Sequence, residues 1–170
     1  MPLMMLANIM PKIKAIKQPT PILLAAGMSQ RMGGLNKLLL PINGVPMVRH
    51  MALTLAAFAD VPTVVVLGHE AQRVAAVLDG IALTIITNVQ YQSGQMSSVT
   101  AGLIAAGQAT DYMICLADLP LLTTADCAAL CVAHKKAGVG QITVPVQRKD
   151  GIFVRRGNPI IIPASARHKI

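Results

Sequence analysis

Short apolar runs alternate along this chain with stretches in which apolar residues recur at helical spacing. The first run, 21–25, is entered from prolines and left at a glycine, which is typical of a buried strand in a parallel sheet. Further β-branched or apolar runs predict strands at 63–67, 83–87 and 112–117. The stretches between them predict helices at 46–58, 70–78, 95–106 and 123–136, the last opened by a capping box of Thr123 and Asp126.

The last third of the chain predicts a different arrangement. A fifth strand is expected at 141–146, followed by a short hairpin in which 151–154 pairs with 159–162 around a turn at 156–158. Alternating strands and helices predict an α/β fold of three layers, with helices on both faces of a mostly parallel, Rossmann-like sheet and a late antiparallel hairpin. Such sheets bind ligands at the carboxyl ends of their strands, so residues that follow the strands are the candidates for function.

The segment after the first strand has the composition of a phosphate site. Residues 26–36 contain three glycines and a serine, so few side chains crowd the backbone N–H groups. Arg31 and Lys37 are expected to place a positive charge on either side of a cavity, and a polyphosphate requires such cations together with amide donors. The spacing matches neither G-x-G-x-x-G nor the P-loop pattern. Taken alone, the loop is equally well explained as a tight turn.

The composition is that of one compact domain, with 54% hydrophobic and 13% charged residues in a chain of 170. The mean hydropathy of +0.57 raises the question of a membrane span. The longest candidate, 45–68, is interrupted by Arg49, His50 and Asp60, and falls short of the roughly 18–20 apolar residues that a span needs. No membrane partner is therefore expected.

The two ends of the chain are predicted to lie outside the folded unit. In 1–20, three lysines follow a methionine-rich apolar run. A secretory signal has its positive charges before the apolar run, so this order is reversed. A basic and poorly ordered extension is therefore expected. The domain itself is predicted at 21–162, with a tail at 163–170. The three cysteines cannot all pair, which favours the cytoplasm. Cys127 and Cys131 are expected to pack in the core rather than to share a metal.

The net charge of +8 requires an anionic partner. Two tyrosines, two phenylalanines and no tryptophan leave no stacking platform for single strands, and no dense run of Lys and Arg marks a duplex-binding face, so nucleic acid is the weaker explanation. A nucleotide with an anionic acceptor is the better one. The four histidines have no ligand-like spacing and are expected to be ordinary surface or cap residues.

Asp118 is the candidate metal ligand. Of the seven acidic residues, it is the one that stands just past the carboxyl end of a buried strand, at the rim expected for the glycine segment. Mg²⁺ takes hard oxygen ligands from carboxylates and fills much of its remaining shell with phosphate and water oxygens. The alternative is a turn aspartate before Pro120.

The glycine segment resembles the nucleotidyltransferases that attach a nucleotide to molybdopterin. The shared pattern is L-A-A-G-x-S-x-R-M-G at 24–33 followed by N-K-L-L-x-P at 36–41, and the aspartate of L-A-D-x-P, here Asp118, binds magnesium in that family. The segment 88–102 is similar to the family motif N-x-x-x-x-x-G-x-x-S-S. The resemblance implies a nucleotide-diphospho-sugar transferase-like fold and nucleotide-binding roles for the following residues: Leu24, Ala25, Ala26, Gly27, Arg31, Lys37, Asn88, Gly94, Ser97, Ser98 and Asp118.

The activity that the resemblance implies is Mg²⁺-dependent transfer of CMP from CTP to the phosphate of molybdopterin, with release of pyrophosphate and with Arg31 and Lys37 as catalytic cations. L-A-A-G resembles the cytidylyltransferases, whereas guanylyltransferases usually carry L-A-G-G, and a methyl group at Ala26 would narrow the base pocket. A molybdoenzyme is a further expected partner. Family members continue past the hairpin with a second metal-binding aspartate that this chain lacks, so a missing C-terminal part and impaired activity are expected.

Three alternatives remain open. A related transferase would use GTP, or a sugar or isoprenoid phosphate as acceptor. A non-catalytic module would bind the molybdenum cofactor and hand it to a molybdoenzyme. A basic nucleic-acid binder would show strongly salt-dependent binding.

Overall fold

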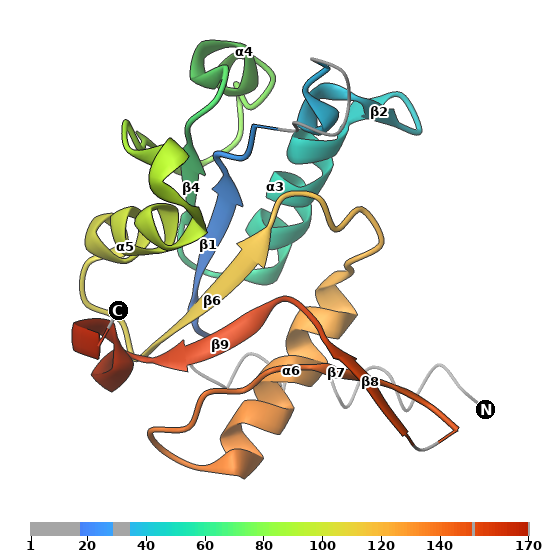
Figure 1. Cartoon of the computed structure of the whole chain (residues 1–170), viewed down its shortest axis with the longest axis vertical. Coiled ribbons are helices and arrows are strands. Elements are labelled where there is room, and N and C mark those ends of the chain that lie inside the picture. The colour runs from blue at the N-terminus through green and yellow to red at the C-terminus, as the bar shows by residue number, and fades with distance from the viewer. Residues whose placement is uncertain (1–17, 29–34, 151, 170) are drawn as a thin grey trace.

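The computed structural model describes residues 18–28, 35–150 and 152–169, and its centre is a five-stranded sheet in the order β5-β4-β1-β6-β9 (Figure 1). β1 (Thr20–Ala25) pairs in parallel with β4 (Thr63–Leu67) and β6 (Asp111–Leu116), and β5 (Leu83–Thr87) pairs in parallel with β4. β9 (Ile160–Pro163) lies antiparallel to β6 at the edge. The α/β fold class and the four parallel strands are therefore confirmed.

Helices cover both faces of this sheet and complete the three predicted layers (Figure 1). α3 (Met47–Phe58), α6 (Thr124–Ala137) and the shorter α4 (Ala71–Ala76) pack on one face, and α5 (Gln95–Ala106) packs on the other. Because side chains alternate along a strand, Leu23 of β1 joins the first of these cores and Leu24 joins the second.

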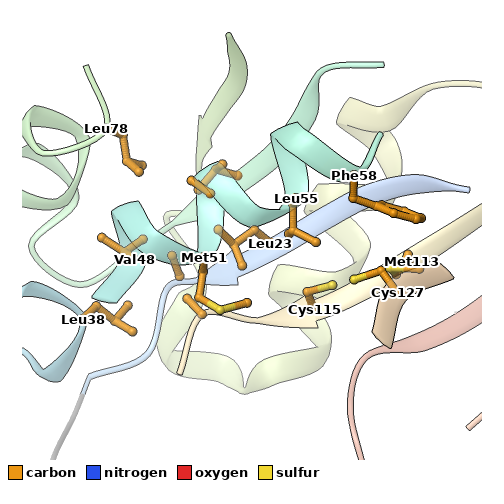
Figure 2. Close-up of a cluster of buried hydrophobic side chains, with 14 of the residues drawn as sticks. Leu23, Leu38, Val48, Met51, Leu55, Phe58, Leu78, Met113, Cys115 and Cys127 are labelled. Atoms are coloured by element: carbon orange, nitrogen blue, oxygen red, sulfur yellow. The ribbon is translucent and has the colours of Figure 1, made fainter. Parts of the chain in front are cut away.

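The larger core lies between the sheet and the helices α3 and α6. Figure 2 shows Leu55 of α3 in one layer with Leu23 of β1, Cys115 of β6 and Cys127 of α6. All three cysteines are free and buried. Within the described residues, no group of three or more His, Cys, Asp or Glu side chains could hold a metal ion. The prediction that Cys127 and Cys131 pack in the core is confirmed.

Helix boundaries follow local chemistry. α6 begins at the predicted capping box, in which Thr123 Oγ1 accepts from the Asp126 N–H at 3.2 Å and the Thr123 N–H donates to Asp126 Oδ2 at 2.9 Å. α4 is shorter than the predicted 70–78. Glu70 stands at its N-cap with φ 52°, and the Leu78 N–H donates to the Ala75 carbonyl, three residues back, so the chain leaves the α-helical pattern there.

The strand pairing predicted for the last third of the chain is wrong in two respects. Apart from a single bridge between Thr143 and Ile161, residues 141–145 form no strand, and β7 (Val146–Lys149) begins where the predicted strand ends. The hairpin joins β7 to β8 (Ile152–Arg156) rather than β8 to β9. β9 is buried against β6, whereas Ile152 and Val154 are exposed. β8 pairs with its neighbour in the chain, whereas the apolar β9 pairs with β6, which lies far back in the sequence and which the pattern of β9 alone does not identify.

His134 is not the ordinary surface or cap residue that the sequence predicts. Its Nδ1 lies 2.7 Å from Thr143 Oγ1 and its Nε2 lies 3.4 Å from Asp111 Oδ1. The imidazole thereby joins α6 to the first residue of β6 and to the segment that precedes β7. These partners lie far apart in the sequence, so spacing alone does not reveal them.

Short elements connect the main ones. η2 (Lys37–Leu39) follows the glycine segment, β2 (Pro41–Ile42) pairs with β3 (Val45–Pro46), and η3 (Tyr91–Ser93) precedes α5. The predicted tail starts at the last residue of β9 and continues as η4 (Ala164–Lys169). Most of the predicted extension lies outside the described residues. No helix in the described part of the chain is both long and apolar enough to cross a bilayer.

Candidate active site

A cavity of about 310 Å³ opens where β1 and β6 end and α5 begins. This is the edge of the sheet at which the sequence predicts a ligand. The residues that line the cavity come from β1 and the glycine segment, η2, η3, the first turn of α5 and the end of β6: Leu24, Ala26, Gly27, Met28, Lys37, Leu38, Tyr91, Gln92, Gly94, Gln95, Ser98, Leu116, Ala117 and Asp118.

An ion pair crosses this site. Lys37 Nζ lies 2.6 Å from Asp118 Oδ2, and both side chains are partly exposed, at 37% and 35%. Asp118 reaches this position because the Ala117 N–H donates to the Leu24 carbonyl at 3.1 Å, which continues the pairing of β6 with β1 to the residue before it. The predicted catalytic cation and the predicted metal ligand are thus direct neighbours.

The turn that carries Lys37 is held by Asn36. The Asn36 side chain is the N-cap of η2, and its Oδ1 accepts from the Leu38 N–H at 3.1 Å. Leu38 is buried in the larger core, and Asn36 itself is 5% exposed. Lys37 thus lies between a buried capping residue, Asn36, and a buried leucine, Leu38. These two neighbours anchor the turn that carries the Lys37 side chain.

Asn88 organises the opposite wall. Its Nδ2 donates to Ser97 Oγ at 2.8 Å and to Ser98 Oγ at 3.0 Å, and its Oδ1 accepts from the Gln90 N–H at 2.9 Å. The residue is buried and does not line the cavity. Its amide therefore ties the end of β5 to the first turn of α5 and sets the position of Ser98, which does line the cavity.

The entry to α5 depends on a glycine. Gly94 has φ 118°, a conformation that residues with a side chain rarely adopt, and its carbonyl accepts from Ser97 Oγ at 2.8 Å. Ser97 Oγ also lies 3.0 Å from the Gln90 carbonyl. These contacts bend the chain so that the N-terminal turn of α5 faces the cavity.

Ala26 packs against its neighbours rather than standing free in the cavity. A Cβ added at Gly68 would lie 2.8 Å from the Ala26 Cβ and 2.7 Å from the Tyr91 Cβ, so Gly68 lets three chain segments meet there. The Ala26 carbonyl accepts from the His69 N–H at 3.3 Å. The Ala26 methyl group thus points toward Gly68, while the residue still contributes to the cavity wall.

Comparison with known proteins agrees with this geometry. The family model described as the MobA-like NTP transferase domain matches residues 21–170. The chain belongs to this family. The matched range includes the residues of η4.

Two curated proteins are similar to this chain in sequence. Nicotine blue oxidoreductase of Paenarthrobacter nicotinovorans is 32% identical over 148 residues, which cover 87% of this chain and 72% of that protein. The bifunctional protein GlmU of Bacillus thuringiensis (strain Al Hakam) is 33% identical over 118 residues. The aligned residues cover 69% of this chain but only 26% of GlmU, so this chain spans about a quarter of that protein's length.

Solved structures share the fold. A nucleotidyl transferase from Methanothermobacter thermautotroptrophicus superposes with a TM-score of 0.71 at 22% identity and covers 89% of this chain and 74% of its own. A CMP:2-keto-3-deoxy-manno-octonic acid synthetase complexed with CTP superposes with a TM-score of 0.69 at 14% identity. The superposition covers 89% of this chain and 76% of the synthetase. The predicted nucleotide-diphospho-sugar transferase-like fold is thereby confirmed.

The structure brings most of the predicted site residues of this MobA-like domain together. The residues that line the cavity are Leu24, Ala26, Gly27, Lys37, Gly94, Ser98 and Asp118. Ala25 instead belongs to the larger core, and Asn88 and Ser97 lie behind the wall. Arg31, predicted as a catalytic cation, lies outside the described residues.

Sequence reasoning missed three polar residues of the wall. Tyr91, Gln92 and Gln95 line the cavity. They fill unspecified positions of the motif at 88–102, so the motif marks their segment without marking them. The turn at η3 and the start of α5 aim them at the site.

Asp118 is suited to a magnesium ion. It supplies a hard carboxylate oxygen beside the cavity and is partly exposed. Mg²⁺ commonly uses one or two protein carboxylates and completes its shell with water and substrate phosphates. A single carboxylate beside this cavity can therefore serve as the protein ligand of this ion.

Proposed function

We propose that this chain transfers CMP from CTP to the phosphate of molybdopterin and releases pyrophosphate. The observation that carries the proposal is the Lys37–Asp118 pair at the mouth of a cavity lined by the glycine segment and the first turn of α5. A cation and a metal-binding carboxylate at one point suit the phosphates of a nucleotide.

The reaction needs no nucleophilic side chain. An oxygen of the acceptor phosphate forms a bond to the α-phosphorus of CTP, and the bond from that phosphorus to the bridging oxygen of the β-phosphate breaks. Lys37 neutralises charge that grows on the phosphates in the transition state, and Gly27 and Met28 of the cavity wall would lie beside these phosphates. Arg31 is proposed as a second cation.

Mg²⁺ is the proposed cofactor, held by Asp118. When bound, it withdraws electrons from the phosphate oxygens and orients them. Asp118 also holds the Lys37 ammonium, so one side chain aligns both positive charges of the site.

The proposed preference for CTP rests on the resemblance to cytidylyltransferases and on the CTP bound by one structural neighbour. The sequence argument from the Ala26 methyl is weaker, because that methyl packs toward Gly68. Ser98 offers a hydroxyl beside the cavity that accepts one bond from Asn88 and has a proton to donate to a base.

Calorimetric titration tests the proposal. CTP is titrated into the purified chain with and without Mg²⁺, with GTP as competitor and Asp118→Asn as the variant. The proposal expects Mg²⁺-dependent binding of CTP that the variant loses, followed by release of pyrophosphate when molybdopterin is added. Binding of neither nucleotide would reject the transferase and favour the non-catalytic cofactor module. Equal turnover of CTP and GTP would contradict the proposed preference for CTP. Release of pyrophosphate with a sugar phosphate in place of molybdopterin would show that the acceptor is a sugar phosphate.

A redox reaction is the second candidate, because a relative that is 32% identical is named nicotine blue oxidoreductase. The same cavity would then hold the redox substrate. Loss of the blue colour of that substrate, coupled to oxidation of an added electron donor and without release of pyrophosphate, would favour this candidate over the transferase.

A further inference from the structure

Tyr91 is the one aromatic residue among those that line the cavity in the described part of the chain. It begins η3, in the segment between β5 and α5, and it is half-buried. The remaining walls carry the Lys37–Asp118 pair and aliphatic side chains such as those of Leu24 and Leu116. The proposed reaction places charged phosphates at the pair, which leaves the role of Tyr91 open.

The position of Tyr91 depends on a glycine at the end of β4. A Cβ added at Gly68 would lie 2.7 Å from Tyr91 Cβ and 2.8 Å from Tyr91 Cγ. Both distances are well inside the roughly 3.5–4.0 Å at which carbon atoms pack. Gly68 does not have a positive φ, so the close approach of the tyrosine, and not a turn, accounts for the missing side chain. The end of a sheet strand thus supports the tyrosine ring.

His69 makes a second contact with the ring. The His69 and Tyr91 ring centroids are 6.3 Å apart, and the ring planes are tilted by 47°. This separation lies within the range at which aromatic rings attract each other. The His69 N–H in turn donates to the Ala26 carbonyl at 3.3 Å, which joins these residues to the glycine segment. Because His69 does not line the cavity, its contact supports the tyrosine from outside the cavity.

The polar residues that line the cavity near Tyr91 suit a heterocycle. Gln92, Gln95 and Ser98, from the same segment of the chain, bring two carboxamides and a hydroxyl to the cavity. An aromatic side chain stacks on the face of a planar ring, whereas amides and hydroxyls bond to the polar atoms at its edge. A phosphate or a sugar has no flat face for Tyr91 to contact.

We infer that Tyr91 is a specificity-determining residue whose ring contacts the face of a planar heteroaromatic ring in the substrate. The inference rests on the proposed function and deepens it, because CTP carries such a ring in its base and molybdopterin carries one in its pterin. A single tyrosine offers a surface for one heterocycle and not for the successive bases of a nucleic-acid strand.

Nuclear magnetic resonance of the tyrosine rings tests the contact without any turnover. The chain has two tyrosines, and Tyr112 is buried and does not line the cavity, so a Tyr112→Phe variant assigns the Tyr91 signals. A heterocycle stacked on Tyr91 should shift its ring-proton signals upfield and leave those of Tyr112 in place. The probes are CTP with Mg²⁺, hydroxymethylpterin, and tripolyphosphate with Mg²⁺ as the control that has no ring.

The probes also distinguish the two sources of the ring. A shift with CTP but not with the pterin would assign Tyr91 to the nucleobase, and the reverse would assign it to the acceptor. If neither compound moves the Tyr91 signals, or if tripolyphosphate moves them equally, the inference is overturned.

Calorimetric titration of matched variants measures what the ring contributes. Tyr91→Leu removes the aromatic face and keeps an apolar side chain, whereas Tyr91→Phe keeps the face and removes only the hydroxyl. Tyr91→Leu should bind the shifting probe about 10-fold more weakly, with unchanged affinity for tripolyphosphate, and Tyr91→Phe should bind both like the unmodified chain. An equal loss in the two variants, or an equal loss for tripolyphosphate, would count against a stacked ring.

Pyrophosphate release, measured on the unmodified chain, separates failure of this inference from failure of the proposed function. Release from CTP and molybdopterin with unmoved Tyr91 signals would retain the transferase and reject the role of Tyr91. Shifted Tyr91 signals without any release would reject the transferase and retain the site for a planar ring.

Discussion

Lys37 and Asp118 are separated by 81 positions in the sequence and by 2.6 Å in the structure. Each was predicted from its own surroundings, Lys37 from a glycine-rich segment and Asp118 from the end of a buried strand. Their contact follows from the parallel pairing of β1 with β6, which brings the carboxyl ends of both strands to one edge. At the residue scale, local patterns identify the chemical groups and the sheet brings them together.

Replacing Lys37 with Ala should reduce kcat for the proposed reaction by about 10²- to 10³-fold, as loss of a group that stabilises transition-state charge does. The free energy of unfolding should change by less than about 1 kcal/mol, because a partly exposed ion pair contributes little. Steady-state kinetics and urea unfolding measure the two effects. Full turnover with weakened CTP binding would show that Lys37 binds substrate without acting in the reaction.

At the scale of elements, α5 approaches the sheet more closely than a helix with a side chain at position 102 could. A Cβ added at Gly102 would lie 2.5 Å from Ile22 Cγ2 and 3.0 Å from Val66 Cγ2. The close approach brings the first turn of α5, with Ser98, to the cavity wall. The packing of one helix therefore shapes one side of the site.

Gly102→Ala should lower the free energy of unfolding by about 1–3 kcal/mol, because the added methyl group overpacks this contact. Gly27→Ala is the matched control for stability, since a Cβ there meets nothing within 4 Å and no positive φ is needed. Denaturant unfolding of both variants is the measurement. Equal stability of the two would mean that α5 shifts without cost.

The capping box makes α6 sensitive to pH. Hydrogen bonds from Thr123, first from its side chain and then from its backbone, lower the pKa of Asp126. A carboxyl whose pKa is lower in the folded state stabilises the fold above its unfolded pKa of about 4, and this contribution is lost as the pH falls through the folded value. Thr123→Ala should therefore cost about 1 kcal/mol at pH 7 and less near pH 3. Unfolding measured at both pH values tests this, and a cost independent of pH would contradict it.

At the scale of the whole molecule, the buried thiols report on the integrity of the larger core. Burial, as the largest cause, raises the pKa of Cys127 to about 12 and that of Cys131 to about 11, and it raises that of Cys115 as well. A thiol that stays protonated and inaccessible reacts slowly. The native chain should therefore resist a thiol reagent at pH 8 and react at all three cysteines in denaturant. Rapid labelling of the native chain would show that the core between α6 and the sheet opens.

The same pKa shifts predict how stability changes in alkaline solution. Because the thiols hold their protons more tightly in the folded state, their contribution is full below the unfolded pKa of about 8.5 and is lost as the pH rises toward the folded values. Urea unfolding between pH 7 and pH 10 should show this decline. The Cys131→Ser variant should show a smaller decline, because a serine hydroxyl does not titrate in this pH range. An unchanged dependence of stability on pH in this variant would argue against the raised pKa of Cys131.

The sequence by itself determined the α/β class, the four parallel strands, the helices and the glycine segment, because apolar periodicity and capping are local properties. It also identified Lys37, Gly94, Ser98 and Asp118, which stand in specific motifs or at a strand end. The tertiary structure decided what depends on distant partners: the pairing of β9 with β6, the Lys37–Asp118 contact and the structural role of Asn88. The local sequence pattern indicates whether a segment forms a helix or a strand. Which distant segment it contacts depends on how the whole chain packs.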